Sequence, residues 1–380
     1  MSERTAVKSK MPNEMEQTPM PLDRERSNGR RLRALLMPPF PWKPERDRWR
    51  NGSGPDPMEL DRQLAAQGID LILLDPGKRP LNPFGGKHPL LQTLDPLRAL
   101  HVLTAWREAD IAIVVFEGGA LPLELLRALF FFRVPVVIWD VALSDTWKLR
   151  EFVLNRVIPR VAGLFVLSTN QKAYIASRWG RTEGVEMIGH RTDTAFYTPV
   201  PASPDGFILS VGEDIGRDFD SLLDVAAGLP AEFVLKTKRI APGAAVPPNV
   251  KIMRERIDYP AFRDLYAQSR FVVVPLVGET LNASGVSTIL EAGAMGRALV
   301  VSETEAMRDY IVPGETCLTV PCGDRNALAA AIRQLIDEPE TCARLGAAAR
   351  RFMEERCSER AFSDRFGALL RRYARKDKAR

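Results

Sequence analysis

A single carboxylate stands in a helix pattern that is otherwise small and apolar, just after a segment suited to binding an anion. It is Glu291, in the stretch NASGVSTILEAGAMG that begins at Asn282. The free N–H groups and the dipole of a helix start attract anions, and glycine lets them approach closely. We therefore expect Ser284, Gly285 and Val286 to bind phosphate, while Glu291, about two turns further along, accepts a pair of hydroxyls. A surface glutamate at a helix start is the alternative interpretation.

Basic side chains at the ends of other strand patterns offer more contacts to phosphate. Arg217 lies in the loop after the strand pattern FILSVG, and Lys236 and Lys238 end the strand pattern EFVLKTK. Because ligands of parallel sheets bind at the carboxyl ends of strands, we expect these side chains to line one cleft and neutralise a diphosphate. Considered singly, a basic residue in such a position is more often a solvated surface charge, and it is their common placement at strand ends that favours a shared site.

The elements that must position these residues alternate strand and helix in two blocks, residues 31–200 and 206–355. The proline-rich segment YTPVPASPDG separates the blocks. Near-continuous Val, Ile and Leu strands between amphipathic helices indicate parallel sheets covered on both faces. We predict an α/β fold of two doubly wound, Rossmann-like domains facing across a cleft. Residues 1–30 are polar and proline-spotted and are predicted to be a disordered leader, and residues 356–380 a C-terminal helix with a basic tail.

Composition bounds the class of protein. The chain has 380 residues, of which 45% are hydrophobic and 27% charged, typical of a soluble globular protein. Its net charge of +5 is mildly basic, and its four cysteines have no paired spacing, which indicates reduced thiols and the cytoplasm. The most apolar region, LPLELLRALFFFRVPVVIWDVAL, is interrupted by charges. With the tail RRYARKDKAR it leaves peripheral contact with the inner face of the membrane open.

The sequence lacks the motifs that are typical of several other functional classes. Neither GxxxxGK[ST] nor a GxGxxG after a strand is present, which disfavours a P-loop NTPase and a dinucleotide dehydrogenase. The acids of DFD, residues 218–220, could suggest a metal site, but they begin a helix pattern, where acids favour the dipole. The three histidines are scattered, so we expect neither a metal site nor a resident cofactor. Basic residues are not interleaved with aromatic ones, and a nucleic-acid partner is not expected.

The second block resembles a known family. The run ASGVSTILEAGAMGRALVVSETEAMRDYIVPGETCLTVPCGD is similar to the nucleotide-sugar-binding half of retaining glycosyltransferases of family 4 (glycosyl transferases group 1), which have the GT-B fold. Weaker landmarks of the family are matched by SVGEDIGRDFDSLL and MIGHRTDTAFYTP. The resemblance covers nearly all of the chain from Arg31 to Arg372, strongly from Gly206 onward and only in outline before it. The resemblance implies a hexosyltransferase-type enzyme of polysaccharide or glycolipid synthesis. It would move sugar from a UDP-, GDP- or ADP-sugar to an acceptor on the first domain, with retention and without a metal. The last helix would cross back to the first domain.

The resemblance also implies residue roles in donor binding. Glu291 resembles the second glutamate of the family's E-x7-E pair, which holds the ribose hydroxyls. Arg217 sits one position from the usual phosphate-binding lysine, for which Lys236 or Lys238 would stand in nearby. Gly285 and Val286 supply the N–H groups of the helix start. Arg254 and Glu255 fall where the family binds the nucleotide base.

The sequence departs from the family at several positions. The first glutamate of the pair is replaced by Ala283, and Glu279 or Asn282 would have to contact the donor sugar. Glu213 replaces the arginine that follows the VG pair. A GT-B protein that is catalytically silent and binds a nucleotide or a protein partner is therefore the leading alternative.

Two acids of the first domain are candidates for catalysis. Glu117 and Asp140 end strand patterns, and Asp140 stands at about the place of a family histidine. Either could orient the acceptor hydroxyl, and either could instead be a helix cap or a turn acid. The sequence leaves open the base, the sugar, the oligomeric state and the acceptor, which could be lipid-linked, a glycan or a small molecule.

Overall fold

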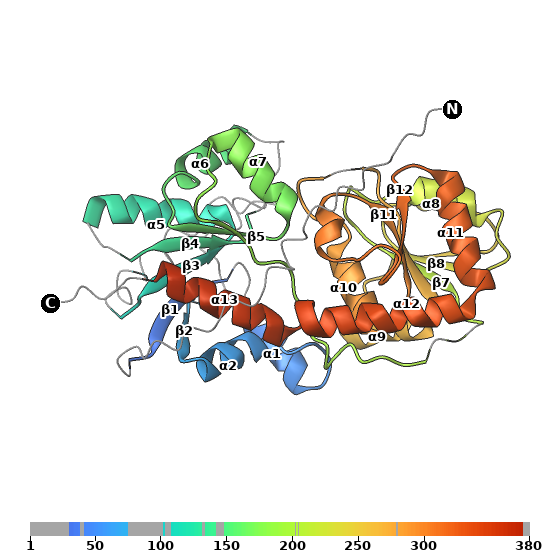
Figure 1. Ribbon diagram of the computed structural model, residues 1–380, viewed down its shortest axis with the longest axis horizontal. Helices are drawn as coiled ribbons and strands as arrows, with labels where there is room; N and C mark the ends of the chain where they lie inside the picture. Colours follow the sequence, from blue (N-terminus) through green and yellow to red (C-terminus); the bar gives the residue numbers. More distant parts are fainter. Residues whose placement is uncertain are drawn as a thin grey trace, which may run out of the picture.

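Two α/β domains lie side by side in the computed structural model of the protein (Figure 1). It describes residues 30–38, 42–74, 102, 108–130, 134–141, 148–201, 203, 205–278 and 280–374. Nearly all of the predicted leader, Glu279 and residues 375–380 therefore lie outside the described residues.

The first domain is built on a parallel six-stranded sheet with the order β2-β1-β3-β4-β5-β6. Helices α5, α6 and α7 contribute to the core on one face, and α2 packs on the other. The strands are β1 (Leu32–Met37), β2 (Ile69–Leu73), β3 (Ile111–Val115), β4 (Val136–Trp139), β5 (Gly163–Val166) and β6 (Val185–Met187). The helices are α1 (Trp42–Arg50), α2 (Glu59–Ala66), α5 (Glu117–Phe130), α6 (Lys148–Val157) and α7 (Thr169–Trp179).

The second domain repeats this design with a parallel six-stranded sheet of order β12-β11-β10-β7-β8-β9. The strands are β7 (Ile208–Val211), β8 (Phe233–Lys236), β9 (Val250–Met253), β10 (Phe271–Val274), β11 (Leu299–Glu303) and β12 (Leu318–Pro321). The helices are α8 (Phe219–Ala226), α9 (Tyr259–Gln268), α10 (Val286–Ala294), α11 (Arg325–Asp337) and α12 (Pro339–Phe352). Two parallel sheets covered by helices confirm the predicted fold class, because strands buried on both faces need continuous apolar sequence.

The strand order of the second sheet changes direction between β7 and β10. Strands β8 and β9 are added on one side of β7, and β10 then returns to its other side. The loops that leave β7 and β10 are tied together: Val277 N–H donates to Gly216 O at 3.0 Å, and Asp218 N–H to Pro275 O at 3.1 Å. In open α/β sheets such a switch point opens a crevice at the carboxyl ends of the strands.

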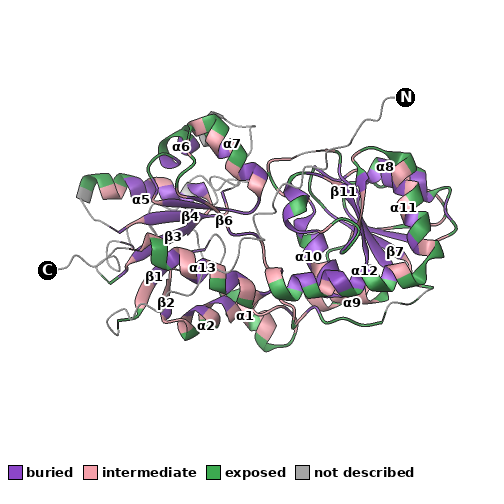
Figure 2. Ribbon diagram, viewed as in Figure 1, coloured by how far each residue is buried: buried purple, intermediate pink, exposed green. Residues whose placement is uncertain are grey.

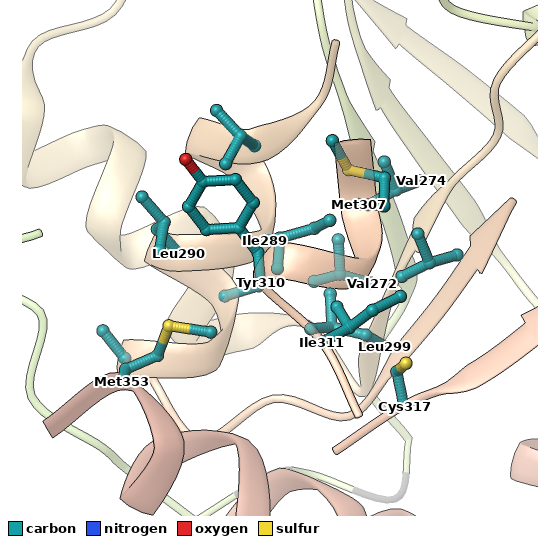
Figure 3. Close-up of a cluster of buried hydrophobic side chains, with 14 of the residues drawn as sticks. Val272, Val274, Ile289, Leu290, Leu299, Met307, Tyr310, Ile311, Cys317 and Met353 are labelled. Carbon is teal, nitrogen blue, oxygen red and sulfur yellow. The ribbon is translucent and has the colours of Figure 1, made fainter. Parts of the chain in front are cut away.

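Helix α10 is buried on almost every side beside this switch point. Ile289 and Leu290 pack among Met307, Tyr310 and Met353 (Figure 3). Gly293 has no room for a side chain, since an added Cβ would lie 2.9 Å from Met353. The small residues of this helix thus let it pack closely, and its N-terminus and Glu291 are held by a packed core.

The last helix, α13 (Glu359–Tyr373), lies against the first domain although it follows the second in the chain (Figure 1). A π-helical turn, Met353–Cys357, joins it to α12, and Ser358 caps its start by accepting from Ala361 N–H. Phe362 and Phe366 pack on Trp139, with ring centroids 5.5 and 5.0 Å apart. The buried stripe of α13 faces the sheet, and its exposed residues face outward (Figure 2). Within the described residues, no helix is long and apolar enough to cross a membrane.

Candidate functional site

A cavity of about 830 Å³ lies where the loops after β7 and β10 meet the start of α10. We call it the switch-point cavity. Its wall is formed by residues 211–217, by Lys236 at the end of β8, by residues 280–285 and by the first turns of α10. The cavity is therefore at the carboxyl ends of β7, β8 and β10, where the topology of the sheet favours a ligand.

Arg217 is almost wholly buried in the wall of this cavity, with 2% of its side chain exposed. Its Nε donates to Asp214 Oδ2 at 3.0 Å and its Nη2 to Thr288 Oγ1 at 2.8 Å. Nη1 is buried and finds no hydrogen-bond partner among the described residues. Burial lowers the pKa of the guanidinium, and Asp214 opposes this. Gly212 makes room for the side chain, because a Cβ there would lie 2.3 Å from Nε.

The start of α10 lies directly beside the unsatisfied Nη1. Gly285 is the N-cap residue, with a left-handed φ of 88°, and no side chain caps the helix. A Cβ on Gly285 would lie 3.2 Å from Arg217 Nη1 and 2.8 Å from Val274 Cγ1. Glycine is therefore required here both for its φ and for the close approach of the guanidinium. The two groups together form a compact set of N–H donors suited to an anion.

One further cation, Lys236, and two acids, Glu213 and Asp214, also line the switch-point cavity. Lys236 is buried at the end of β8, and its Nζ lies 3.9 Å from Glu213 Oε1, which is a long ion pair. Ser284 Oγ donates to Asp214 Oδ1. Burial raises the pKa of Asp214, but Arg217 and Ser284 outweigh it, so that the pKa is lowered. A long pair such as that of Lys236 leaves its ammonium able to turn toward an anionic ligand.

Glu291 lies between the switch-point cavity and a second cavity of about 520 Å³. Burial raises its pKa to about 7, although hydrogen bonds from two tyrosines lower it. Tyr266 Oη donates to Oε2 at 2.8 Å and Tyr197 Oη to Oε1 at 3.2 Å. The second cavity, which we call the α1–α9 cavity, is lined from both domains, by Glu45, Arg48, Arg256, Ile257, Asp258, Tyr259 and Phe262 besides Glu291.

Seven of the predicted donor-site residues line the switch-point cavity: Arg217, Lys236, Asn282, Ser284, Gly285, Val286 and Glu291. Three others do not. Lys238 is exposed in the bend beyond the end of β8. Arg254 donates to Ile240 O and Ala241 O at 3.0 and 2.8 Å, so its guanidinium is used to hold a loop, and Glu255 is exposed. The following residues, Arg256–Asp258, line the α1–α9 cavity in their place.

The two predicted acids of the first domain stand at the carboxyl ends of neighbouring strands. Glu117 begins α5 immediately after β3 and is buried, and Asp140 follows β4. Asp140 and Phe116, which precedes Glu117, have left-handed φ values of 62° and 66°. Such angles cost a non-glycine residue free energy, so the surrounding structure must impose them. Neither acid lines the switch-point cavity, and their role in catalysis stays a prediction.

His190 was not predicted as a site residue, yet it brings the first domain to the switch-point cavity. Its backbone N–H donates to Tyr310 Oη at 3.0 Å, and the Tyr310 hydroxyl donates to Leu167 O. Burial, with a smaller contribution from Arg191, lowers the pKa of His190 to about 4, so the imidazole is neutral at pH 7. Its position after a short strand pattern was the available sequence signal.

The acids of DFD have a structural role at the start of a helix. Asp218 accepts from Ser221 N–H as the N-cap of α8, and the described residues contain no metal-binding group of His, Cys, Asp and Glu.

Comparisons with known proteins agree on the architecture. Residues 225–338 match the family model described as Glycosyl transferases group 1. No curated protein matched the chain. A sucrose-phosphate synthase from Thermosynechococcus elongatus is 19% identical with a TM-score of 0.66, covering 90% of this chain and 99% of that one. Anabaena HepE in complex with UDP and glucose is 15% identical with a TM-score of 0.61, covering 90% and 100%. The lipopolysaccharide outer core galactosyltransferase WaaB is 13% identical with a TM-score of 0.60, covering 90% and 99%.

The fold is therefore that of the GT-B glycosyltransferases. The segment of the second domain that matches the group 1 model includes Lys236, Glu291 and Thr288, which accepts a hydrogen bond from Arg217.

We expect Glu291→Gln to stabilise the protein more at pH 8 than at pH 5. The pKa of Glu291 is raised from 4.5 to about 7 in the fold, so between these values the folded protein retains a proton that the unfolded chain releases. The free energy of unfolding therefore falls as pH rises through this window, by roughly 3 kcal/mol in total. Glutamine removes that loss. Urea denaturation of the wild type and the variant at the two pH values measures the difference between their free energies of unfolding. The same difference at pH 5 and pH 8 would contradict the raised pKa of Glu291.

Proposed function

We propose that the protein is a glycosyltransferase that moves a sugar from a nucleoside diphosphate sugar to an acceptor. The observation that carries this proposal is the buried Nη1 of Arg217, which lacks a partner among the described residues and adjoins the uncapped start of α10. A dianionic diphosphate would satisfy both at once. The group 1 match over residues 225–338 and the structural likeness to HepE, solved in complex with UDP-glucose, support the same donor class.

The two cavities suggest how the donor is oriented. The diphosphate would lie in the switch-point cavity against Arg217, Lys236 and the N–H groups of α10. The ribose hydroxyls would reach Glu291, which borders both cavities, and the base would enter the α1–α9 cavity beside Arg256. The donor would be a UDP-, GDP- or ADP-sugar. The site would then use positive charge and N–H groups at the phosphates and a carboxylate at the ribose hydroxyls.

Transfer in this proposal depends on stabilising the leaving group. As the bond between sugar and phosphate breaks, negative charge grows on the nucleoside diphosphate. Arg217 is already fixed by Asp214 and Thr288, so its free N–H is oriented before reaction and needs little reorganisation. Loss of one such contact typically costs about 2–4 kcal/mol of transition-state stabilisation. We include retention and independence of metal in the proposal on the strength of the sequence resemblance, with Glu117 or Asp140 orienting the acceptor hydroxyl.

A catalytically silent nucleotide-binding protein is the second candidate. Ala283 lines the switch-point cavity at the position where the resemblance requires a glutamate, and Glu213 pairs with Lys236. Binding of a nucleoside diphosphate sugar without release of the diphosphate, over the whole range of acceptors tried, would favour this candidate.

The two lysines of the β8 segment provide a matched test of donor binding. We expect UDP, GDP or ADP to raise the melting temperature of the wild-type protein. Lys236→Gln should weaken binding of that nucleotide about tenfold, because it removes a charge-assisted contact to phosphate. Lys238→Gln, at the exposed position outside the cavity, should change the affinity less than about twofold. Calorimetric titration of the three proteins checks this.

Failure of all three nucleotides to bind or stabilise the wild-type protein would contradict the proposed function. Equal losses in the two lysine variants would instead contradict the placement of the phosphates.

Peripheral contact with an anionic membrane is also part of the proposal. Leu125 and Leu129, one turn apart on α5, are 56% and 70% exposed, and Phe152 on the adjoining helix α6 is 47% exposed. Arg156 stacks on Phe152, with its Cζ 3.6 Å from the ring centroid. Apolar side chains next to arginine on one end of the first domain suit the boundary between lipid headgroups and acyl chains.

We expect Leu125→Asp combined with Leu129→Asp to abolish most sedimentation of the protein with phosphatidylglycerol vesicles. The added charges would have to be desolvated in the headgroup region. Val246→Asp, at an exposed position of the second domain, is the control and should sediment as the wild type does. Absence of wild-type sedimentation with phosphatidylglycerol, or equal sedimentation with phosphatidylcholine, would argue against an anionic membrane as the partner.

A further inference from the structure

Glu291 is held by two buried tyrosines that come from different parts of the chain. Tyr266 lies on α9 and is fully buried, and Tyr197 lies in the segment between the two domains with 3% exposure. The hydroxyl of Tyr266 reaches Oε2 at 2.8 Å, and that of Tyr197 reaches Oε1 at 3.2 Å. Each carboxylate oxygen therefore accepts one tyrosine hydroxyl.

The described residues provide Glu291 with no ion pair. A buried carboxylate without a cation is costly, and such groups occur chiefly where they serve a function. Tyr259 is the third tyrosine close enough to interact with Glu291 electrostatically. The other titratable or charged side chains that line its two cavities are His190, Glu213, Asp214, Arg217, Lys236, Glu45, Arg48, Arg256 and Asp258.

The tyrosine hydroxyls are fixed in direction by the groups around them. The rings of Tyr197 and Tyr266 pack edge to face with centroids 6.4 Å apart, and Phe262 packs on Tyr266 at 5.4 Å. Arg350 donates to Tyr197 O at 2.7 Å and to Ala294 O, at the end of α10, at 2.6 Å. The backbone of Tyr197 is thus tied to the same helix that carries Glu291.

We infer that Tyr197 and Tyr266 are positioning residues, which orient the Glu291 carboxylate so that it accepts the two hydroxyls of the donor's ribose. A carboxylate oxygen has about two acceptor sites, and each tyrosine uses one. One site on each oxygen is left for the vicinal 2′ and 3′ hydroxyls, and Glu291 is in contact with both cavities. The inference rests on the proposed function, because it requires a ribonucleotide in this site.

The arrangement also has a consequence for pH. The two tyrosine hydroxyls stabilise the ionised form of Glu291, and burial opposes them, with a resulting pKa of about 7. Removing either hydroxyl raises the pKa further. Since the ionised carboxylate is the better acceptor for hydroxyls, preference for a ribonucleotide should weaken below pH 7 in the wild type and already at a higher pH in a variant that lacks one hydroxyl.

The test compares ribonucleotides with nucleotides that lack both ribose hydroxyls. Calorimetric titrations use UDP, GDP and ADP and their 2′,3′-dideoxy counterparts, between pH 6 and pH 9, on the wild type, Tyr197→Phe and Tyr266→Phe. Tyr373→Phe is the matched control, because the Tyr373 hydroxyl donates to Glu186 Oε1 at 2.7 Å in the first domain. The dideoxy nucleotides share the titration of the phosphates and isolate the contribution of ribose.

We expect each site variant to lose about tenfold in affinity for the bound ribonucleotide and none for its dideoxy counterpart. The pH midpoint of the ribose preference should also move upward. Tyr373→Phe should behave as the wild type does. Unchanged dideoxy binding also shows that the variants are folded.

Two results would overturn the inference alone: an unchanged ribose preference in both variants, or an equal loss for ribo- and dideoxynucleotides. Failure of every nucleotide to bind the wild type would instead overturn the proposed function, and this inference with it.

Discussion

A guanidinium buried beside the start of a helix is the feature on which the arrangement of the second domain depends. Burying a cation is costly unless its N–H groups are satisfied. Asp214 and Thr288 satisfy part of Arg217, and its Nη1 is left beside the N-terminus of α10. Glycine is needed at 212 because a Cβ there would lie 2.3 Å from Arg217 Nε, and at 285 because of its left-handed φ and a Cβ contact of 2.8 Å with Val274. The loops after β7 and β10 are hydrogen bonded to each other, which keeps this geometry rigid.

Helix α10 connects this anion site to the rest of the molecule. Its packed faces hold Glu291 at the boundary of two cavities, and two tyrosines hold the carboxylate itself. The first domain reaches the same region through His190 and through bonds such as Thr169 N–H to Asp309 Oδ2 at 2.7 Å. Helix α13 packs on the first sheet and so fixes one domain against the other. Residues of both domains therefore line the two cavities beside Glu291.

Much of this could be predicted from the sequence, because it depends on local patterns. Apolar strands between amphipathic helices predicted both parallel sheets, and the glycine at 285 followed by a small-residue helix predicted the start of α10. Lys236 and Lys238 could not be distinguished, since the strand ends between them. Arg254 was assigned to the base, but two carbonyl groups of a nearby loop already accept from its guanidinium.

The contacts that sequence patterns did not predict join residues that are distant in the chain. Tyr197 and Glu291 are separated by 94 positions, and His190 and Tyr310 by 120. Such pairs are set by how the domains pack, and no local periodicity reports them. Tyr197 is the first residue of the predicted linker YTPVPASPDG, and nothing in that pattern indicates that its side chain is buried against a carboxylate.

The most direct test of the account is a crystal structure of the protein with the nucleoside diphosphate that binds it most tightly. We expect phosphate oxygens within hydrogen-bond distance of Arg217 Nη1 and of the first N–H groups of α10, and ribose hydroxyls within hydrogen-bond distance of the Glu291 carboxylate. A nucleotide bound elsewhere, or one whose phosphates leave Arg217 Nη1 without a partner, would contradict it.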